Sequence, residues 1–365
     1  MNFKKLDEHF EFLKDLGVPF SSVKVVKDGR LVYQNIFGKK DNGEKIGYDD
    51  QFYFYSASKM LAVTSAMMLY DEGKLKLEDK VSKFIPEFEN LFVGKEKTPC
   101  KKDMTIYHLL TMTNGYGYDW HENLKECIKD KNASTLDVLK AISKDYIWFE
   151  PGEKFCYGFG HDILAGVVEV ISGMRYSEFV NKRIFEPLGM NDSCFQPTEE
   201  IKQNMFVQTR FCEETGEFKV ANKENNFIFT ANYDSGGAGL ISTTNDYIKF
   251  VKALANYGVC EDGTVLLKKE TIDLIREDHL TDVQKKTFFK GPHYSYGLGV
   301  RTLIDGESSK GPVGEFGWDS AACSFFAIDV ENNVGIFYGC HTLGWGKGYE
   351  YHYKLRDIVY ECLEK

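Results

Sequence analysis

Strand-like segments at both ends of the chain, with a helical middle between them, constrain the fold more than any other feature. Residues 23–38, "VKVVKDGRLVYQNIFG", predict two strands joined by a turn at Asp28 and Gly29. Near the C-terminus, runs rich in β-branched and aromatic residues predict three more strands, over residues 296–304, 314–330 and 332–341. Because sequence-distant strands need partners, the simplest fold pairs both ends in one domain.

Helical spacing of apolar residues marks most of the remaining chain. It predicts terminal helices over residues 2–16 and around Leu355 and Val359, and internal helices over residues 56–72, 106–112, 135–142, 161–173 and 242–258. We therefore predict an α/β (α+β) protein, in which residues 1–52 and 288–365 form a discontinuous α/β domain. Residues 53–287 form a mainly helical inserted region, and a cleft between two such parts is a common ligand site.

Composition narrows the classes of partner. The 365 residues are 43% hydrophobic and carry a net charge of −10, without a basic stripe, so nucleic acid is not an expected partner. The N-terminus lacks a signal-peptide apolar region, and no apolar run is long enough to cross a bilayer, so we expect a cytoplasmic protein without membrane attachment. Nine scattered cysteines without a C-x-x-C pair fit reduced thiols.

The stretch "FYFYSASKML", residues 52–61, places Ser56 three positions before Lys59 at the start of an apolar helix. Residues at this spacing share a helix face, and the helix N-terminus favours negative charge. Desolvation of Lys59 would lower its pKa and allow it to accept the serine proton. The spacing alone is weak evidence, since Ser21 and Lys24 repeat it and Ser56 could simply cap the helix.

Tyr157 lies in a second segment of interest, "PGEKFCYGFGHDILAGVVEVISG". A Pro-Gly turn precedes this tyrosine, two glycines surround it, and a helix is predicted directly after it. A phenol in such a loop can project into a cleft, and a neighbouring ammonium group would favour loss of its proton. Tyr157 is one of 21 tyrosines, however, and an ordinary core or surface aromatic is the alternative.

Taken together, seven segments resemble, in order, the serine β-lactamase-related family, which includes class C β-lactamases, D-Ala-D-Ala carboxypeptidases and family VIII carboxylesterases. The resemblance covers almost the whole chain and rests on these segments: "VVKDGRLVYQNIFG", "FYFYSASKM", "MTIYHLLTMTNG", "EPGEKFCYGFGHDILAGVVEVISG", "IFEPLGMNDSCF", "SGGAGLISTTNDYIKFVKAL" and "GEFGWDSAACSFFAIDVENN". It implies a β-lactamase/transpeptidase-like fold, with an antiparallel sheet flanked by N- and C-terminal helices plus a mainly helical domain.

The resemblance also implies roles for individual residues. Ser56 is expected to be the acylated nucleophile, Lys59 the motif lysine and Tyr157 the partner acid or base. Which of Lys59 and Tyr157 takes the serine proton is left open, as it is for such sites generally. The backbone N–H groups of Ser56 and Ala321 are expected to form the oxyanion hole.

Two motifs depart from the β-lactamase pattern. The second motif, usually Tyr-x-Asn, ends in Phe159, and an acidic residue, Asp162, follows five positions after the tyrosine. In the third motif, Trp318 replaces the usual cation, and Asp319 and Ser320 follow it. Trp318 cannot pair with a substrate carboxylate and Asp319 would repel one, so β-lactams and D-Ala-D-Ala peptides should bind poorly. Ser320 in place of glycine is expected to tighten the oxyanion hole, and we expect all four residues, Phe159 included, to contact substrate.

Other chemistry is not supported by the sequence. The "YDSGGAG" stretch over residues 233–239 is interpreted as a glycine-rich turn, and no G-x-S-x-G elbow is present. The eight histidines show no zinc-binding pattern, so we expect neither a metal nor a cofactor.

The sequence therefore predicts a serine hydrolase that cleaves small carboxylic esters through an acyl-enzyme at Ser56. Acyl transfer to an alcohol or amine is the neighbouring hypothesis. A D-amino-acid peptidase or amidase, suggested by Asp319, or a β-lactamase-like hydrolase is the alternative enzyme. A penicillin-binding-type protein with little turnover is the alternative of another class. The expected partner is a small-molecule ester or amide, and the oligomeric state is left open.

Overall fold

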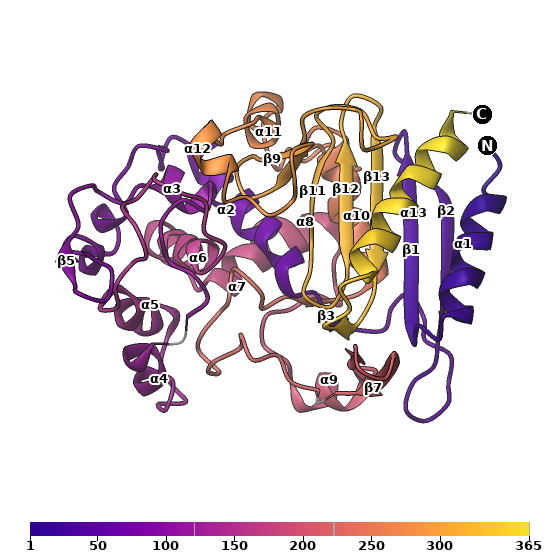
Figure 1. The fold of residues 1–365 in the computed structure, drawn as a ribbon, viewed down its shortest axis with the longest axis horizontal. Helices are drawn as coiled ribbons and strands as arrows, with labels where there is room; N and C mark the ends of the chain where they lie inside the picture. Colours follow the sequence, from indigo (N-terminus) through magenta and orange to yellow (C-terminus); the bar gives the residue numbers. More distant parts are fainter. Residues whose placement is uncertain (120, 222, 365) are drawn as a thin grey trace.

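A seven-stranded antiparallel sheet built from both ends of the chain forms one side of the molecule (Figure 1). The computed structural model describes residues 1–119, 121–221 and 223–364. The strand order is β2-β1-β13-β12-β11-β10-β9. The strands are β1 (Phe20–Lys27), β2 (Arg30–Gly38), β9 (Tyr294–Tyr296), β10 (Arg301–Leu303), β11 (Phe316–Asp319), β12 (Phe325–Asp329) and β13 (Val334–Gly339).

Helices cover both faces of this sheet. The terminal helices α1 (Lys4–Asp15) and α13 (Gly348–Leu363) lie on one face, and α10 (Thr244–Ala255) packs against β12 and β13 (Figure 1). Successive β13 side chains point to opposite faces, so Ile336 and Tyr338 join the core under the terminal helices while Phe337 joins the core beside α10. Every residue of β13 is buried, which explains its unbroken apolar sequence.

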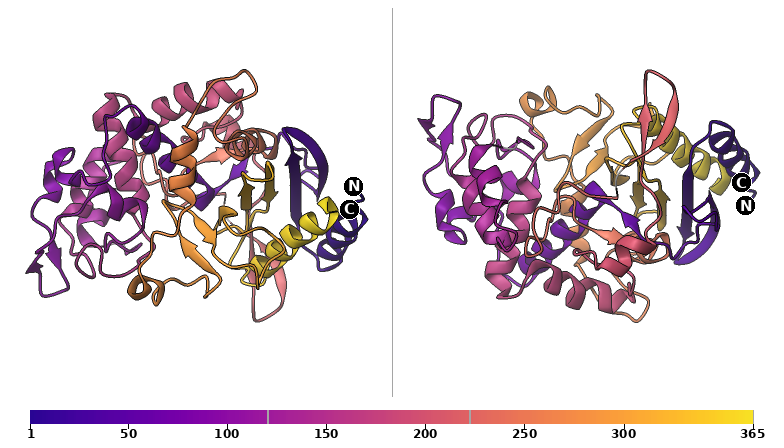
Figure 2. Two further views of the ribbon diagram at one scale, coloured as in Figure 1. Left: turned by 90° about the horizontal axis from the view of Figure 1, so that it is seen from above. Right: turned by 90° about the horizontal axis from the view of Figure 1, so that it is seen from below.

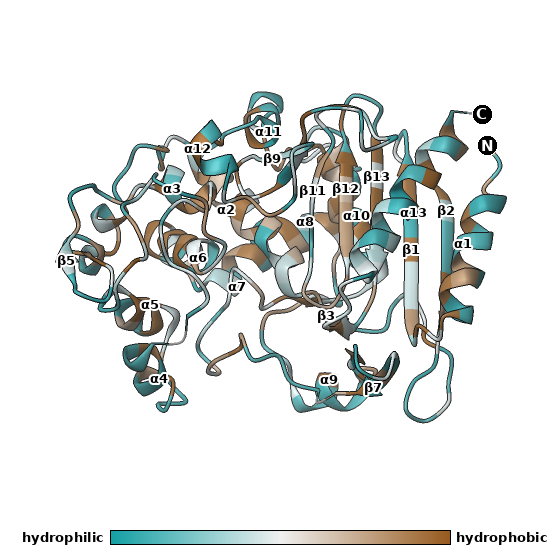
Figure 3. Cartoon of the chain, in the orientation of Figure 1, coloured by the Kyte–Doolittle hydropathy of each residue, from teal (hydrophilic) through white to brown (hydrophobic). Residues whose placement is uncertain are grey.

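The helical part lies beside the sheet, as the two views of Figure 2 show. Its centre is α2 (Lys59–Asp71), which packs against α6 (Gly160–Ser172) and is buried from Lys59 to Leu69. Brown apolar colour gathers on α6 and on the inner strands, whereas the outer surfaces of α1 and α11 are teal (Figure 3). A helix that is apolar on all sides belongs in the interior, which accounts for the position of α2.

The remaining helices and strands are short, and several of them, such as α3 and α5, pack on α6 within the helical part. They are β3 (Phe52–Tyr53), β4 (Phe92–Val93), β5 (Thr98–Pro99), α3 (Ile106–Leu110), α4 (Glu122–Cys127), α5 (Thr135–Ser143), α7 (Tyr176–Val180), α8 (Glu186–Leu188), α9 (Glu199–Asn204), β6 (Thr209–Cys212), β7 (Glu217–Val220), β8 (Ile241–Ser242), α11 (Lys269–Arg276), α12 (Asp282–Lys285) and β14 (Thr342–Leu343). Helix α10 falls within residues 53–287 of the sequence yet packs on the sheet. No helix in the described parts of the chain has the length and apolar character needed to cross a membrane.

Two segments predicted as single strands are hairpins instead. Residues 296–304 bend at Gly299, where φ is +81°, between β9 and β10. Residues 314–330 turn at residues 320–324 between β11 and β12, where Ser320 N–H donates to Ser324 O at 2.8 Å and Cys323 has a φ of 65°. Apolar residues on both sides of this turn hide it from the sequence pattern. The turn brings Ala321 to the same cavity as Ser56.

Candidate active site

Ser56 lies in a 3-10 turn, Tyr55–Ser58, that leads directly into α2. The sequence predicted an α-helix from Ser56, whereas the regular helix begins at Lys59. Ser58 Oγ fixes the turn, because it donates to Tyr55 O at 2.5 Å and accepts from Leu240 N–H at 2.9 Å. Tyr55 has a φ of 45°, in the left-handed region that costs a non-glycine residue about 1–3 kcal/mol. The fold holds this strained residue next to the serine.

Three groups surround the Lys59 amine. Lys59 Nζ lies 3.3 Å from Ser56 Oγ, 2.8 Å from Tyr118 Oη and 2.7 Å from Gly237 O. A neutral amine has two N–H donors and one lone pair. The carbonyl of Gly237 can only accept a hydrogen bond, so it takes one N–H of the amine. If Tyr118 Oη accepts the other N–H, the lone pair of Lys59 Nζ faces Ser56 Oγ. The geometry therefore suits transfer of the serine proton to Lys59.

The side chain of Lys59 is 0% exposed, and this burial lowers its pKa from 10.5 to about 7, against an opposing effect of the Asp162 charge. Asp162 does not bind the amine directly. Its carboxylate accepts hydrogen bonds from Tyr233 Oη at 2.8 Å, Ser235 Oγ at 2.6 Å and Gly237 N–H at 3.1 Å. It thereby holds the peptide of Gly237, whose carbonyl binds Lys59.

Tyr157 faces the same site. Its ring lies under the Lys59 amine, 4.5 Å from the ring centroid, and Trp318 Nε1 donates to Tyr157 Oη at 2.9 Å. Burial raises the pKa of Tyr157, while hydrogen bonds with Ser56 and Trp318 lower it by less. This differs from the sequence-based expectation that a nearby ammonium would favour the phenolate, because burial is the largest effect on the pKa of Tyr157 and raises it. Tyr157 keeps its proton near neutral pH.

The two expected oxyanion-hole residues meet at the cavity. Ser56 and Ala321 both line it, one from the turn before α2 and the other from the turn after β11. Within the described parts of the chain, neither backbone N–H donates a hydrogen bond. Two unpaired N–H groups at one cavity are what a developing oxyanion requires.

The cavity has a volume of about 530 Å³, and five of its ten lining residues are aromatic. Its lining consists of Ser56, Tyr157, Phe289, Lys290, Trp318, Asp319, Ser320, Ala321, Tyr349 and Tyr353. Phe159 is not among these residues. It is buried, and its ring packs 5.0 Å from that of Tyr118, so it supports the tyrosine that holds Lys59 and does not contact the cavity.

Asp319 does not present a free charge to the cavity, contrary to the sequence interpretation. It is buried and forms an ion pair with Lys290, accepts from Tyr353 Oη at 3.0 Å, and lies 3.0 Å from His352 Nε2. The opposing charge of Lys290 holds the pKa of Asp319 below its usual range despite burial. Ser320 directs its side chain into its own turn, where Oγ accepts from Ser324 N–H at 3.1 Å.

Tyr118, Gly237 and Lys290 were not singled out from the sequence, and neither were the aromatic lining residues Phe289, Tyr349 and Tyr353. Gly237 belongs to the "YDSGGAG" stretch, which was interpreted as a turn alone, although its glycines already indicated a close backbone approach. A Cβ at Gly237 would overlap Asp162 Oδ2 and lie 2.9 Å from Tyr118 Oη. Tyr118 and Lys290 carry no local sequence signal, because only the tertiary fold brings them to the site.

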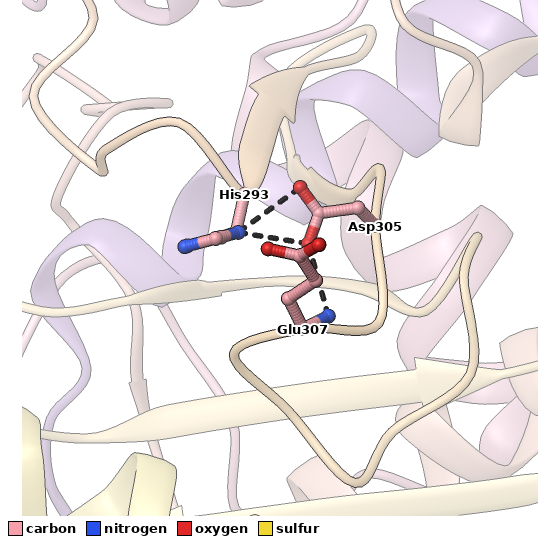
Figure 4. Close-up of side chains that lie close together, drawn as sticks. All are labelled: His293, Asp305 and Glu307. Atoms are coloured by element: carbon pink, nitrogen blue, oxygen red, sulfur yellow. Dashed lines mark hydrogen bonds and ion pairs between the residues drawn. The ribbon is translucent and has the colours of Figure 1, made fainter.

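One group of side chains in the described residues is close enough to hold a metal ion: His293, Asp305 and Glu307 (Figure 4). It lies at the open end of the β9–β10 hairpin, outside the cavity lining. Asp305 is already bound to His293 Nδ1, at 2.8 and 3.0 Å, and to the backbone N–H of Glu307 at 3.0 Å. These contacts satisfy the carboxylate without an ion, so we assign no function to the group.

Comparisons with known proteins identify the family and the fold of the chain as a whole. A family model described as Beta-lactamase matches residues 6–361. Lovastatin esterase of Penicillium rubens is 26% identical over 365 aligned residues, which cover 90% of each chain. Among solved structures, EstCE1, a hydrolase with promiscuous acyltransferase activity, has a TM-score of 0.84 at 22% identity and 98% coverage of both chains. Simvastatin synthase (LovD) from Aspergillus terreus has a TM-score of 0.83 at 18% identity and 100% coverage of both chains.

Proposed function

The chain belongs to the Beta-lactamase family and has its fold, as the sequence predicted, and from this premise we propose that it hydrolyses small carboxylic esters through an acyl-enzyme at Ser56. One observation carries the proposal: a fully buried lysine with a pKa of about 7 lies 3.3 Å from a serine hydroxyl in an aromatic cavity. A base with a pKa near the working pH combines the correct protonation state with a good driving force for proton transfer.

In the proposed acylation step, Ser56 Oγ attacks the ester carbonyl carbon while its proton moves to neutral Lys59. The carbonyl oxygen becomes an oxyanion bound by the N–H groups of Ser56 and Ala321. When the C–O bond to the alcohol breaks, the Tyr157 phenol gives its proton to the leaving oxygen, and the Lys59 ammonium restores the proton of Tyr157. Water then attacks the acyl-enzyme with the same groups, releasing the acid and regenerating Ser56.

The third motif supports a preference for esters over β-lactams. Trp318 occupies the position of the usual cation and uses its N–H group to bind Tyr157. The cavity does contain a cation, Lys290, but Asp319 balances its charge. A substrate carboxylate would have to compete with Asp319 for that ammonium group, which disfavours β-lactams and D-Ala-D-Ala peptides.

Acyl transfer is the second candidate. One structural neighbour is described as a hydrolase with promiscuous acyltransferase activity and another is named as a synthase. An aromatic cavity that binds the attacking alcohol would favour transfer over hydrolysis. The peptidase alternative loses its motivating observation, because Asp319 is paired with Lys290 and is not free to bind a substrate amine.

The test is hydrolysis of p-nitrophenyl acetate and butyrate, with nitrocefin in parallel, by the wild type and Ser56→Ala. We expect ester turnover that is lost in the variant, with little cleavage of nitrocefin. Turnover that survives in Ser56→Ala would contradict the nucleophile. Rapid nitrocefin cleavage would contradict the interpretation of Trp318. An added alcohol that raises p-nitrophenol release and yields a new ester would identify acyl transfer.

A further inference from the structure

The ammonium group of Lys290 occupies an aromatic box on the cavity wall. Lys290 Nζ lies 5.5 Å from the ring centroid of Trp318, 5.3 Å from that of Tyr349 and 5.5 Å from that of Tyr353. Asp319 completes the box as an ion-pair partner of the same ammonium group. Aromatic faces around a carboxylate are the arrangement with which proteins bind ligand cations, including quaternary ammonium groups. Here, the occupant is a side chain of the protein itself.

The box and its occupant come from different segments. Trp318 and Asp319 lie on β11, and Tyr349 and Tyr353 lie on α13. Lys290 reaches the box from the segment between α12 and β9, next to Phe289, which is 60% exposed. The box therefore does not need the Lys290 side chain for its own construction.

Lys290 and Asp319 are the two charged residues in the cavity lining, within the part of the chain that the structure describes. His352, on the other side of Asp319, is buried and its pKa is lowered, so it is neutral near pH 7. Arg301 acts on Asp319 at longer range, but its guanidinium is bound to Glu315 at 2.6 Å. Lys290 is thus the group that cancels the charge of Asp319 toward the cavity.

We propose that Lys290 sets the charge preference of the cavity: it keeps the box filled and neutral, so that neutral esters are accepted and esters bearing a trialkylammonium group are rejected. Without the Lys290 side chain, three aromatic rings and an uncompensated carboxylate face the substrate. The preference then shifts toward cationic esters. This proposal rests on the proposed ester hydrolysis and names the residue that decides its substrate class.

The experiment compares pairs of substrates that have the same shape and differ in one charge. Acetylthiocholine and 3,3-dimethylbutyl thioacetate place the charge on the leaving group, and p-nitrophenyl esters of 4-(trimethylammonio)butyrate and 5,5-dimethylhexanoate place it on the acyl group. For each pair, the ratio of kcat/KM for the cationic to the neutral ester is measured in the wild type and in Lys290→Ala, which removes both the charge and the side chain that fills the box. We expect the ratio to rise roughly tenfold or more in at least one pair.

The control is Lys285→Ala, the same substitution in a lysine that pairs with Asp278 and lies outside the cavity lining. Its ratios should equal those of the wild type. The double variant Lys290→Ala/Asp319→Asn should also return toward the wild-type ratio, because it removes both charges. Unchanged ratios in Lys290→Ala, with a cooperative melting curve, would overturn the proposal. If Lys290→Ala does not fold, Lys290→Ser is judged by the same criterion.

A binding measurement separates this proposal from the proposed function. Tetramethylammonium is titrated while tryptophan fluorescence is recorded, since Trp318 forms one wall of the box. Saturable binding is expected in Lys290→Ala and not in the wild type. If no ester is cleaved but the variant binds tetramethylammonium, the proposed ester hydrolysis is wrong and the proposed cation box is supported. If esters are cleaved but the variant neither binds tetramethylammonium nor changes the ratio of kcat/KM for cationic to neutral esters, the proposed cation box is wrong and the proposed hydrolysis is supported.

Discussion

Lys59 Nζ lies 3.3 Å from Ser56 Oγ, although no part of the lysine is exposed to solvent. Burying an amine is costly unless it gives up its charge or is compensated. Lys59 gives up its charge more readily than usual, since its pKa falls to about 7. Its neutral amine donates a hydrogen bond to the carbonyl of Gly237 at 2.7 Å. The same burial that makes Lys59 unfavourable as an ammonium makes it suitable as a base for Ser56.

The pKa of Lys59 predicts the pH dependence of ester hydrolysis. Because the pKa is lowered to about 7, the protonated, inactive form dominates below pH 7 and the neutral base above it. We expect kcat/KM for a neutral ester to rise with pH, pass its midpoint near pH 7 and then level off. Lys59→Arg, whose side chain stays protonated, should lower kcat/KM by roughly 10²–10⁴-fold. A midpoint near pH 10, or activity that falls between pH 6 and 8, would contradict this assignment.

The hydroxyl of Tyr118 should matter for catalysis because Lys59 Nζ is 2.8 Å from it. Tyr118→Phe removes one of the two groups that orient the amine, and we expect a loss of roughly tenfold or more in kcat/KM. Tyr116→Phe is the matched control, since the buried Tyr116 hydroxyl has no hydrogen-bond partner among the described residues. Equal losses in the two variants would show that the effect is structural.

Trp318→Phe tests the hydrogen bond between the indole and Tyr157. The variant keeps an aromatic ring but removes the N–H group that binds Tyr157 Oη at 2.9 Å. Since this bond lowers the pKa of the phenol, its loss should raise that pKa and slow proton transfer, with about a tenfold loss in kcat. In a Tyr157→Phe background the same substitution should have little further effect. Additive losses would mean that Trp318 acts mainly through the substrate.

Gly237→Ala should reduce stability as well as activity. A Cβ there would overlap the Asp162 carboxylate, and crowding of this kind costs about 1–3 kcal/mol. We expect a lower urea midpoint than for Gly306→Ala, where the Cβ would meet no atom within 4 Å. A Gly237→Ala protein as stable as the control, with unchanged kcat/KM, would refute the role of this peptide in holding Lys59.

The sequence predicted those features that are encoded locally. Asp28 and Gly29 both have positive φ in the turn between β1 and β2, as the Asp-Gly pair indicates. Ser134 caps α5 and accepts from Asp137 N–H at 3.2 Å. The spacing of Ser56 and Lys59 likewise puts both groups on one face of one short segment, so their proximity follows from local geometry.

What the sequence did not predict depends on contacts between distant segments. Asp319 and Lys290 are 29 positions apart, and their ion pair exists because the segment after α12 folds over β11. Asp319 was therefore interpreted as a free charge. The raised pKa of Tyr157 has the same origin, since desolvation depends on the surrounding fold and not on neighbours in sequence.

The most direct test of the central claim is the mass of the intact protein after brief reaction with p-nitrophenyl butyrate and acid quenching. The account predicts that one butyryl group is added, that peptide mapping locates it on Ser56, and that Ser56→Ala gains none. A butyryl group on another residue, or ester turnover that continues in Ser56→Ala, would contradict the assignment of Ser56 as the nucleophile.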